Sequence, residues 1–224
     1  MHAAYFPLKD ELRAKYNKTA VLEFFKQAEG LPYGYHNFLF GWIDTKEDNL
    51  PPVMPWKIIP IALTLFERLQ PATVLKLVGE GLNMRLGTKG LSMVELYSEV
   101  EKHNTTMEEL WTVPEQDKWE YSDGWSYVCS SFVVAVYKEA GLFGDLDVQA
   151  TEFTPRDLYE LDFFNNTAPV PHNCFVADPE LPYCQLLGKY RIKLQDDYST
   201  ITPYEHMNEH CPSKNPEYYR PDGC

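Results

Sequence analysis

Residues 125–141 limit most strongly how this chain can fold, because an aromatic run changes there into an apolar helical pattern. The change falls at Cys129, and Gly141 is a natural C-terminal stop. The apolar residues at helical spacing are Phe132, Val133, Val136 and Tyr137. Cys129 is therefore expected at a helix N-terminus, where unpaired N–H groups and the helix dipole favour a thiolate. A thiolate is the nucleophilic form of cysteine.

The alternative is that Cys129 is simply buried, since free cysteine is among the most buried residue types and is usually inert. The surrounding residues favour the reactive interpretation. Tyr-Val-Cys129-Ser-Ser-Phe-Val, followed by Ala-Gly-Leu, resembles the nucleophile helix of the NlpC/P60 superfamily of papain-like cysteine hydrolases. Gly-Leu-Pro-Tyr33 after a helical stretch resembles the same superfamily, and Thr154-Pro-Arg-Asp-Leu is similar to its circularly permuted subgroup. The resemblance covers roughly residues 9–40 and 119–165.

The resemblance implies an α+β fold with a papain-like core and Cys129 as nucleophile. N–H groups at the start of the cysteine helix would stabilise an oxyanion. Tyr33 is expected to line the substrate pocket, with an aromatic side chain packed on the core as the alternative, and Tyr127 and Ser130 beside the nucleophile are further expected substrate contacts. The reaction would be cleavage of an amide, ester or thioester, without a metal or cofactor.

A cysteine hydrolase also needs a catalytic base that accepts the thiol proton, and the sequence does not identify this base clearly. His36 precedes Cys129, as the permuted order demands, and is the first choice among the histidines. His172 is the second, although Val-Pro-His-Asn-Cys resembles a loop rather than the expected strand. Neither matches the family well, because permuted relatives place the histidine strand ahead of the helix that here begins near Lys9. The base would then lie in a removed N-terminal segment, belong to a separate chain of the same precursor, or be absent altogether.

We expect one domain over residues 1–224, with a helical insertion at 46–114 and a strand and Cys/Pro-rich tail at 172–224. Helices are predicted at 9–28, 58–69, 72–86 and 91–102, the last beginning near Ser92, and from Pro155 after a Thr154 cap. Strands are predicted at 3–6 and 185–194. The insertion could cover the active site, but packing onto the domain or onto a partner chain explains most of its leucines more simply.

Four of the five cysteines lie in the last quarter of the chain. That clustering predicts two disulfides, most simply Cys174 with Cys184 and Cys211 with Cys224, although four cysteines allow three connectivities. Cys129 would remain the free thiol. Zinc is the competing use, with His172, His206 and His210 nearby, but the spacing is no recognised zinc pattern, so no metal is expected.

The net charge of −13 argues against nucleic acid and anionic membranes as partners, and no apolar run is long enough to span a bilayer. Three sequons, at Asn17, Asn104 and Asn165, together with the cysteines, favour the secretory route and an extracellular, lysosomal or vacuolar location. The expected partner is a small-molecule, peptide or lipid-like acyl substrate. The rival function is a non-catalytic extracellular glycoprotein module used for binding or assembly.

Overall fold

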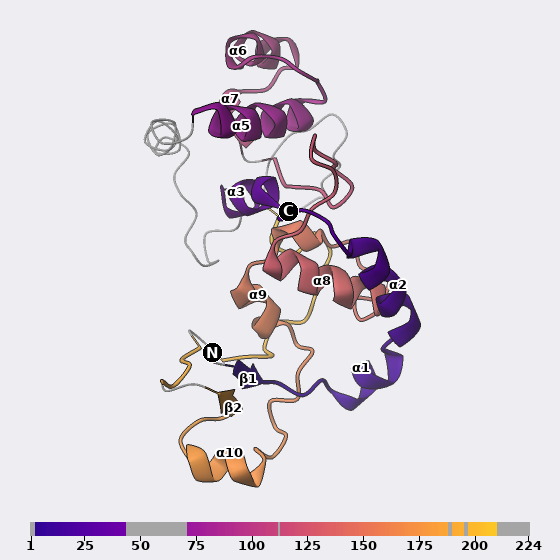
Figure 1. Cartoon of the computed structure of the whole chain (residues 1–224), viewed down its shortest axis with the longest axis vertical. Helices are drawn as coiled ribbons and strands as arrows, with labels where there is room; N and C mark the ends of the chain where they lie inside the picture. The colour runs from indigo at the N-terminus through magenta and orange to yellow at the C-terminus, as the bar shows by residue number, and fades with distance from the viewer. Residues whose placement is uncertain (1–2, 44–70, 112, 188–189, 195–196, 210–224) are drawn as a thin grey trace.

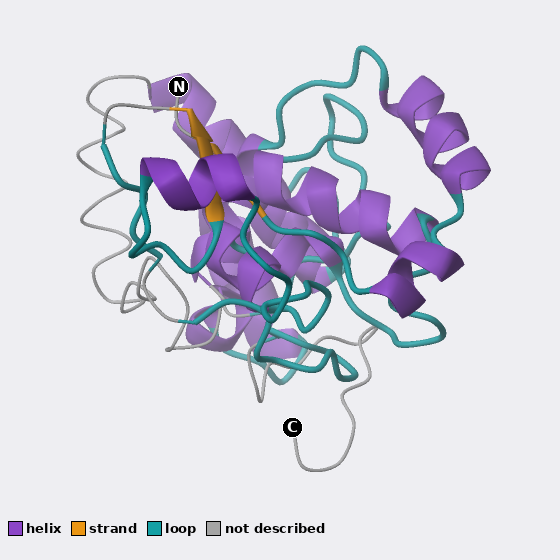
Figure 2. Ribbon diagram, turned by 90° about the horizontal axis from the view of Figure 1, so that it is seen from below, coloured by secondary structure: helices purple, strands orange, loops and turns teal. Residues whose placement is uncertain are grey.

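The computed structural model describes residues 3–43, 71–111, 113–187, 190–194 and 197–209. Its elements, labelled in Figure 1, follow in chain order. They are β1 (Ala3–Tyr5), α1 (Asp10–Lys15), α2 (Lys18–Ala28), α3 (Tyr35–Ile43), α5 (Pro71–Leu86), α6 (Met93–Lys102), α7 (Met107–Trp111), α8 (Cys129–Glu139), the 3-10 helix η2 (Ala150–Glu152), α9 (Pro155–Glu160), α10 (His172–Ala177) and β2 (Cys184–Leu187). The fold is α+β, with helices predominating over one short sheet in the described parts (Figure 2).

The main core forms around α8, which lies in the middle of the molecule in Figure 1. Val134, Ala135 and Val136 of α8 are buried together with Val21 and Phe24 of α2. The expected helix from Cys129 is confirmed, and Gly141 follows it with φ 77°, a conformation that glycine adopts without steric cost. α9 also begins as predicted, because the Thr154 side chain accepts a hydrogen bond from the Asp157 N–H.

The helix predicted over residues 9–28 is wrong at its centre, because the structure divides it into α1 and α2. Tyr16 leaves the helical conformation with ψ 109°, and Asn17 caps α2 by accepting a hydrogen bond from the Ala20 N–H at 3.1 Å. The Asn17 N–H donates to the carbonyl oxygen of Ala140 at 3.0 Å, so the break ties the start of α2 to the end of α8.

The helices α5, α6 and α7 lie at one end of the molecule and have an apolar cluster of their own (Figure 1). Phe40 of α3 packs into this cluster and is fully buried. The predicted helix at 72–86 is confirmed as α5, and the helix near Ser92 is confirmed as α6, with a capping box between Ser92 and Glu95. The helix predicted at 58–69 lies outside the described residues.

β1 and β2 form a two-stranded antiparallel sheet, with Ala4 opposite Gln185 and Tyr5 opposite Cys184. The predicted strand at 3–6 is confirmed, but the one at 185–194 is too long: β2 ends at Leu187 and residues 191–194 are not in a strand. The loop expected around His172 is also wrong, because these residues form α10. A disulfide joins Cys174 of α10 to Cys184 of β2, as predicted.

Candidate functional site

Cys129 is the first residue of α8, and its side chain is exposed and free of any disulfide. The preceding residue, Val128, is the N-cap, and the Ser131 hydroxyl fixes its backbone by accepting from the Val128 N–H at 2.9 Å. The N–H groups in the first turn of a helix have no carbonyl partner within that helix. Cys129 therefore lies beside backbone donors that can stabilise negative charge.

Cys129 is one of the residues that line an open pocket of about 290 Å³. Its walls come from two segments, one at the end of α2 and one leading into α8. The lining residues are Ala28, Leu31, Pro32, Tyr33, Tyr127, Val128, Cys129 and Phe132. None of the described residues of α5, α6 or α7 lines this pocket, so these helices do not cover the thiol in this structure.

The two walls are joined by backbone pairing. Tyr33 forms a parallel bridge with Tyr127, and the Gly34 N–H donates to the Tyr127 carbonyl oxygen at 2.9 Å. A Cβ atom on Gly34 would lie 3.0 Å from the Tyr127 carbonyl carbon, so this close approach favours glycine. The Gly-x-Pro-Tyr segment is thereby held against the segment that carries Cys129.

The three expected substrate contacts have different environments. Tyr33 and Tyr127 both line the pocket, and Tyr33 is 46% exposed. Burial, with smaller effects of the negative charges of Asp117 and Glu139, raises the pKa of Tyr127. Ser130 is buried and is not among the pocket-lining residues.

His36 is buried in α3, and its imidazole contacts groups other than Cys129. The ring is stacked on Tyr121 with 3.8 Å between centroids, and Nε2 lies 3.3 Å from Oε2 of Glu80. Burial lowers the pKa of His36, opposed mainly by the negative charges of Asp123 and Glu80. This arrangement favours the neutral form of the His36 imidazole.

The other described histidines lie elsewhere, and none of them lines the Cys129 pocket. His172 begins α10, and His103 caps the C-terminus of α6 beside Glu99. His206 has its Nδ1 atom 3.0 Å from Oε2 of Glu209. In the described residues the structure therefore brings Tyr33 and Tyr127 to Cys129 but no histidine.

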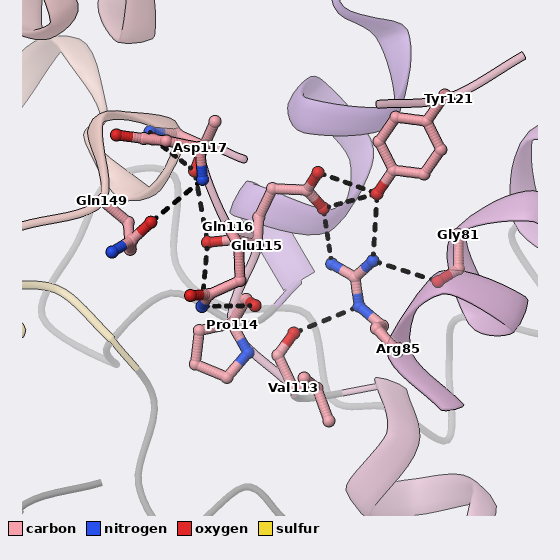
Figure 3. A network of polar contacts seen from close by, with 10 residues as sticks. Gly81, Arg85, Val113, Pro114, Glu115, Gln116, Asp117, Tyr121 and Gln149 are labelled. Carbon is pink, nitrogen blue, oxygen red and sulfur yellow. Dashed lines mark hydrogen bonds and ion pairs between the residues drawn. The ribbon is translucent and has the colours of Figure 1, made fainter. Parts of the chain in front are cut away.

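A buried ion pair links α5 to the segment that precedes the candidate site (Figure 3). Arg85 is 0% exposed, and its guanidinium donates to Oε2 of Glu115 at 2.8 Å and to the carbonyl oxygen of Val113 at 3.1 Å. The Tyr121 hydroxyl donates to Glu115 at 2.8 Å. Burial raises the pKa of Glu115 against the lowering effect of Arg85, and burial and the Glu115 charge raise the pKa of Tyr121 well above its usual value.

The ion pair extends toward the main core through Glu115 and its neighbours (Figure 3). The Thr151 hydroxyl donates to the Glu115 carbonyl oxygen at 3.2 Å, and the Asp117 N–H donates to the Gln149 side chain at 3.0 Å. Lys138 of α8 forms an ion pair with Asp117. Sequence reasoning missed this network, because Arg85 and Glu115 are far apart in the chain and neither lies in a recognisable motif.

The remaining predicted sites are found mainly on the surface. Asn17 and Asn104 are exposed, and Asn165 is half-buried. Oδ1 of Asn165 accepts hydrogen bonds from the N–H of Thr167 at 3.1 Å and from its hydroxyl at 2.9 Å. Cys211 and Cys224 lie outside the described residues, so their pairing stays a prediction.

The described residues contain no group of three or more His, Cys, Asp and Glu side chains that could hold a metal ion. No helix in the same ranges is long and apolar enough to cross a membrane.

Comparison of the chain with protein families, with characterised proteins and with solved structures finds no match in any of the three.

Proposed function

We propose that the chain is a papain-like cysteine hydrolase or acyltransferase of the permuted NlpC/P60 type, which cleaves an amide, ester or thioester through Cys129. One observation carries the proposal: the thiol is free and exposed at the first residue of α8, inside a pocket whose other wall is the Gly-x-Pro-Tyr segment. A cysteine that served only packing would be buried among apolar side chains.

The reaction follows from this placement. The Cys129 thiolate attacks the substrate carbonyl, a C–S bond forms, and the negative charge on oxygen faces the N–H groups that begin α8. The bond to the leaving group then breaks, and the leaving group departs with a proton. Water or an acceptor hydroxyl attacks the resulting thioester, which releases the acyl product and restores the thiol.

The proton acceptor has to come from outside the described walls of the pocket, since no histidine lines them. Two sources are consistent with this requirement. His36 is separated by a single residue from Gly34, which pairs with Tyr127, so a rearrangement of this segment could turn its imidazole toward Cys129. The other source is a histidine on a separate chain of the same precursor.

Two measurements test the enzyme proposal. Hydrolysis of p-nitrophenyl acetate should be lost in Cys129→Ser, and Cys129 should react with iodoacetamide at pH 6 faster than free cysteine does. If the base lies off the chain, added imidazole should accelerate the hydrolysis by the wild type but not by Cys129→Ser. Slow alkylation with no Cys129-dependent turnover would reject the proposal.

The second candidate is a non-catalytic extracellular glycoprotein module used for binding or assembly. It is favoured by the burial of His36 against Tyr121 and Glu80, which leaves the thiol without a described base. Fast alkylation together with esterase activity would exclude this alternative.

We also propose passage through the secretory pathway, to the cell exterior or to a lysosome or vacuole. The Cys174–Cys184 disulfide and the exposed sequon residues Asn17 and Asn104 support this location. Expression in a glycosylating cell should give a product whose mass falls after endoglycosidase treatment. Asn17→Gln and Asn104→Gln should each remove one glycan, and an unglycosylated product would contradict the assignment.

A further inference from the structure

The pocket at Cys129 adjoins a second hollow on the outer face of α2. The second hollow has a volume of about 490 Å³ and is lined by Leu22, Phe25, Lys26, Ala28, Glu29 and Phe132. Ala28 and Phe132 line both hollows, so together they form a surface that leads from the thiol along α2. This combined surface is called the Phe132 groove below.

The walls of the Phe132 groove are mostly apolar. Its charged side chains, Lys26 and Glu29, belong to the hollow distant from the thiol. Leu22 is 48% exposed and Phe25 is 42% exposed, although both lie on a helix whose core-facing residues are already buried. Phe25 stacks on Phe132 with the ring centroids 5.9 Å apart. The core therefore does not account for this second apolar face of α2.

On the wall opposite α8, two backbone N–H groups are already paired. The Leu31 N–H donates to the Ala28 carbonyl oxygen at 3.2 Å, and the Gly34 N–H donates to Tyr127. A peptide bound as an added strand needs free backbone donors and acceptors along its path. A sugar or charged group would lose hydration against the apolar side chains of Phe25 and Phe132.

We propose that the Phe132 groove binds the unbranched aliphatic acyl chain of the substrate and holds its carbonyl carbon at Cys129. This substrate class rests on the proposed function, because the groove is a substrate-binding site only if Cys129 at its end is the nucleophile. The walls offer dispersion contacts and apolar surface along the chain, which suits methylene groups. The acyl chain lies over Phe132 and extends toward Phe25 and Leu22.

The test uses N-alkylmaleimides with chains of two to eight carbons, which label thiols without any turnover. The rate of labelling at Cys129 is read from the mass of the peptide that contains it. In the wild type the rate constant should rise by about two- to fourfold for each added methylene, as expected for partial to full burial of the chain. In the variant that carries Leu22→Gln and Phe25→Gln, the rate should stop rising once the chain extends beyond the hollow at the thiol, so the octyl reagent should react more slowly than it does with the wild type.

Matched controls separate the groove from general effects. The double variant should react with the ethyl reagent at the wild-type rate, because both replaced side chains are partly exposed and lie in the distant hollow. Tyr97→Gln removes a helical aromatic residue that is 57% exposed on α6, and it should leave the whole series unchanged. A loss of chain-length dependence in Tyr97→Gln as well would overturn the proposal.

The outcomes for the groove and for the enzyme are distinguishable. Labelling rates that do not rise with chain length, or a carboxyalkyl maleimide that reacts faster than its alkyl counterpart, would overturn the acyl groove even if p-nitrophenyl acetate is hydrolysed. Chain-length-dependent labelling without Cys129-dependent hydrolysis of p-nitrophenyl octanoate would support the groove and reject the hydrolase.

Discussion

The imidazole of His36 lies flat against the phenol ring of Tyr121, with 3.8 Å between ring centroids and 3° between their planes. This contact places an ionisable group at 2% exposure, facing Glu80 on α5 and within the fields of Asp123, Arg85 and Lys76. Burial outweighs these charges and lowers the pKa of His36. Folding therefore favours the neutral ring.

A folded-state pKa below the unfolded value of about 6.5 means that the unfolded chain binds the proton more readily. The contribution of His36 to stability is therefore present above about pH 6.5 and is lost as the pH falls through the lower folded value. We expect the free energy of unfolding, measured in urea between pH 5 and 8, to fall on acidification by up to about 1.4 kcal/mol per pH unit. His36→Gln should flatten this dependence, and His103→Gln, at an exposed position, should not. An unchanged slope in His36→Gln would contradict the assignment.

Two glycines on the same turn of α5 should respond in opposite directions to alanine. A Cβ atom on Gly81 would lie 2.0 Å from Cε2 of the fully buried Phe40, whereas nothing lies within 4 Å of the corresponding position at Gly79. We expect Gly81→Ala to cost about 1–3 kcal/mol from overpacking. Gly79→Ala should stabilise the protein by up to about 1 kcal/mol through helix propensity. Equal urea midpoints for the two variants would disprove the packing of α3 on α5.

Removing only one partner of the buried pair of Arg85 and Glu115 should strongly lower the free energy of unfolding. Arg85→Met leaves the Glu115 carboxylate at 1% exposure without its cation, and we expect a loss of about 3–5 kcal/mol in the free energy of unfolding. Adding Glu115→Gln to Arg85→Met should recover part of the loss, because the buried charge is then removed. Lys102→Met, which breaks an exposed pair with Glu99, should cost less than about 1 kcal/mol. A small effect of Arg85→Met alone would contradict the burial of the pair.

The disulfide closes a short loop between residues separated by ten positions. Replacing both Cys174 and Cys184 by serine should cost about 2–3 kcal/mol, because the unfolded chain regains the entropy of an open loop. Thermal unfolding with and without reductant provides the measurement. Reductant should lower the Tm of the wild type and leave that of the double variant unchanged. A wild-type Tm that is insensitive to complete reduction would show that the bridge adds no stability.

Much of the candidate site could be predicted from local sequence, because caps and helical periodicity depend on residues within about one turn of each other. The start of α8 at Cys129, the Ser92 cap of α6 and the Thr154 cap of α9 are of this kind. The strand β1 and the Cys174–Cys184 pairing were also predicted. The division of α1 from α2 was not, because it depends on the contact of Asn17 with Ala140 at the end of α8.

The amino-acid sequence by itself determined that a free cysteine begins an amphipathic helix and that Gly-x-Pro-Tyr and Thr-Pro-x-Asp-Leu accompany it. Only the tertiary structure decided which side chains lie beside that cysteine. It placed Tyr33 and Tyr127 at the thiol, turned His36 away to Tyr121 and Glu80, and paired Arg85 with Glu115. The physical reason is that contacts between distant segments, rather than neighbours in the sequence, set what each buried side chain lies against. Arg85 is paired with the Glu115 carboxylate, whereas the ring nitrogens of His36 make no hydrogen bond to the described residues.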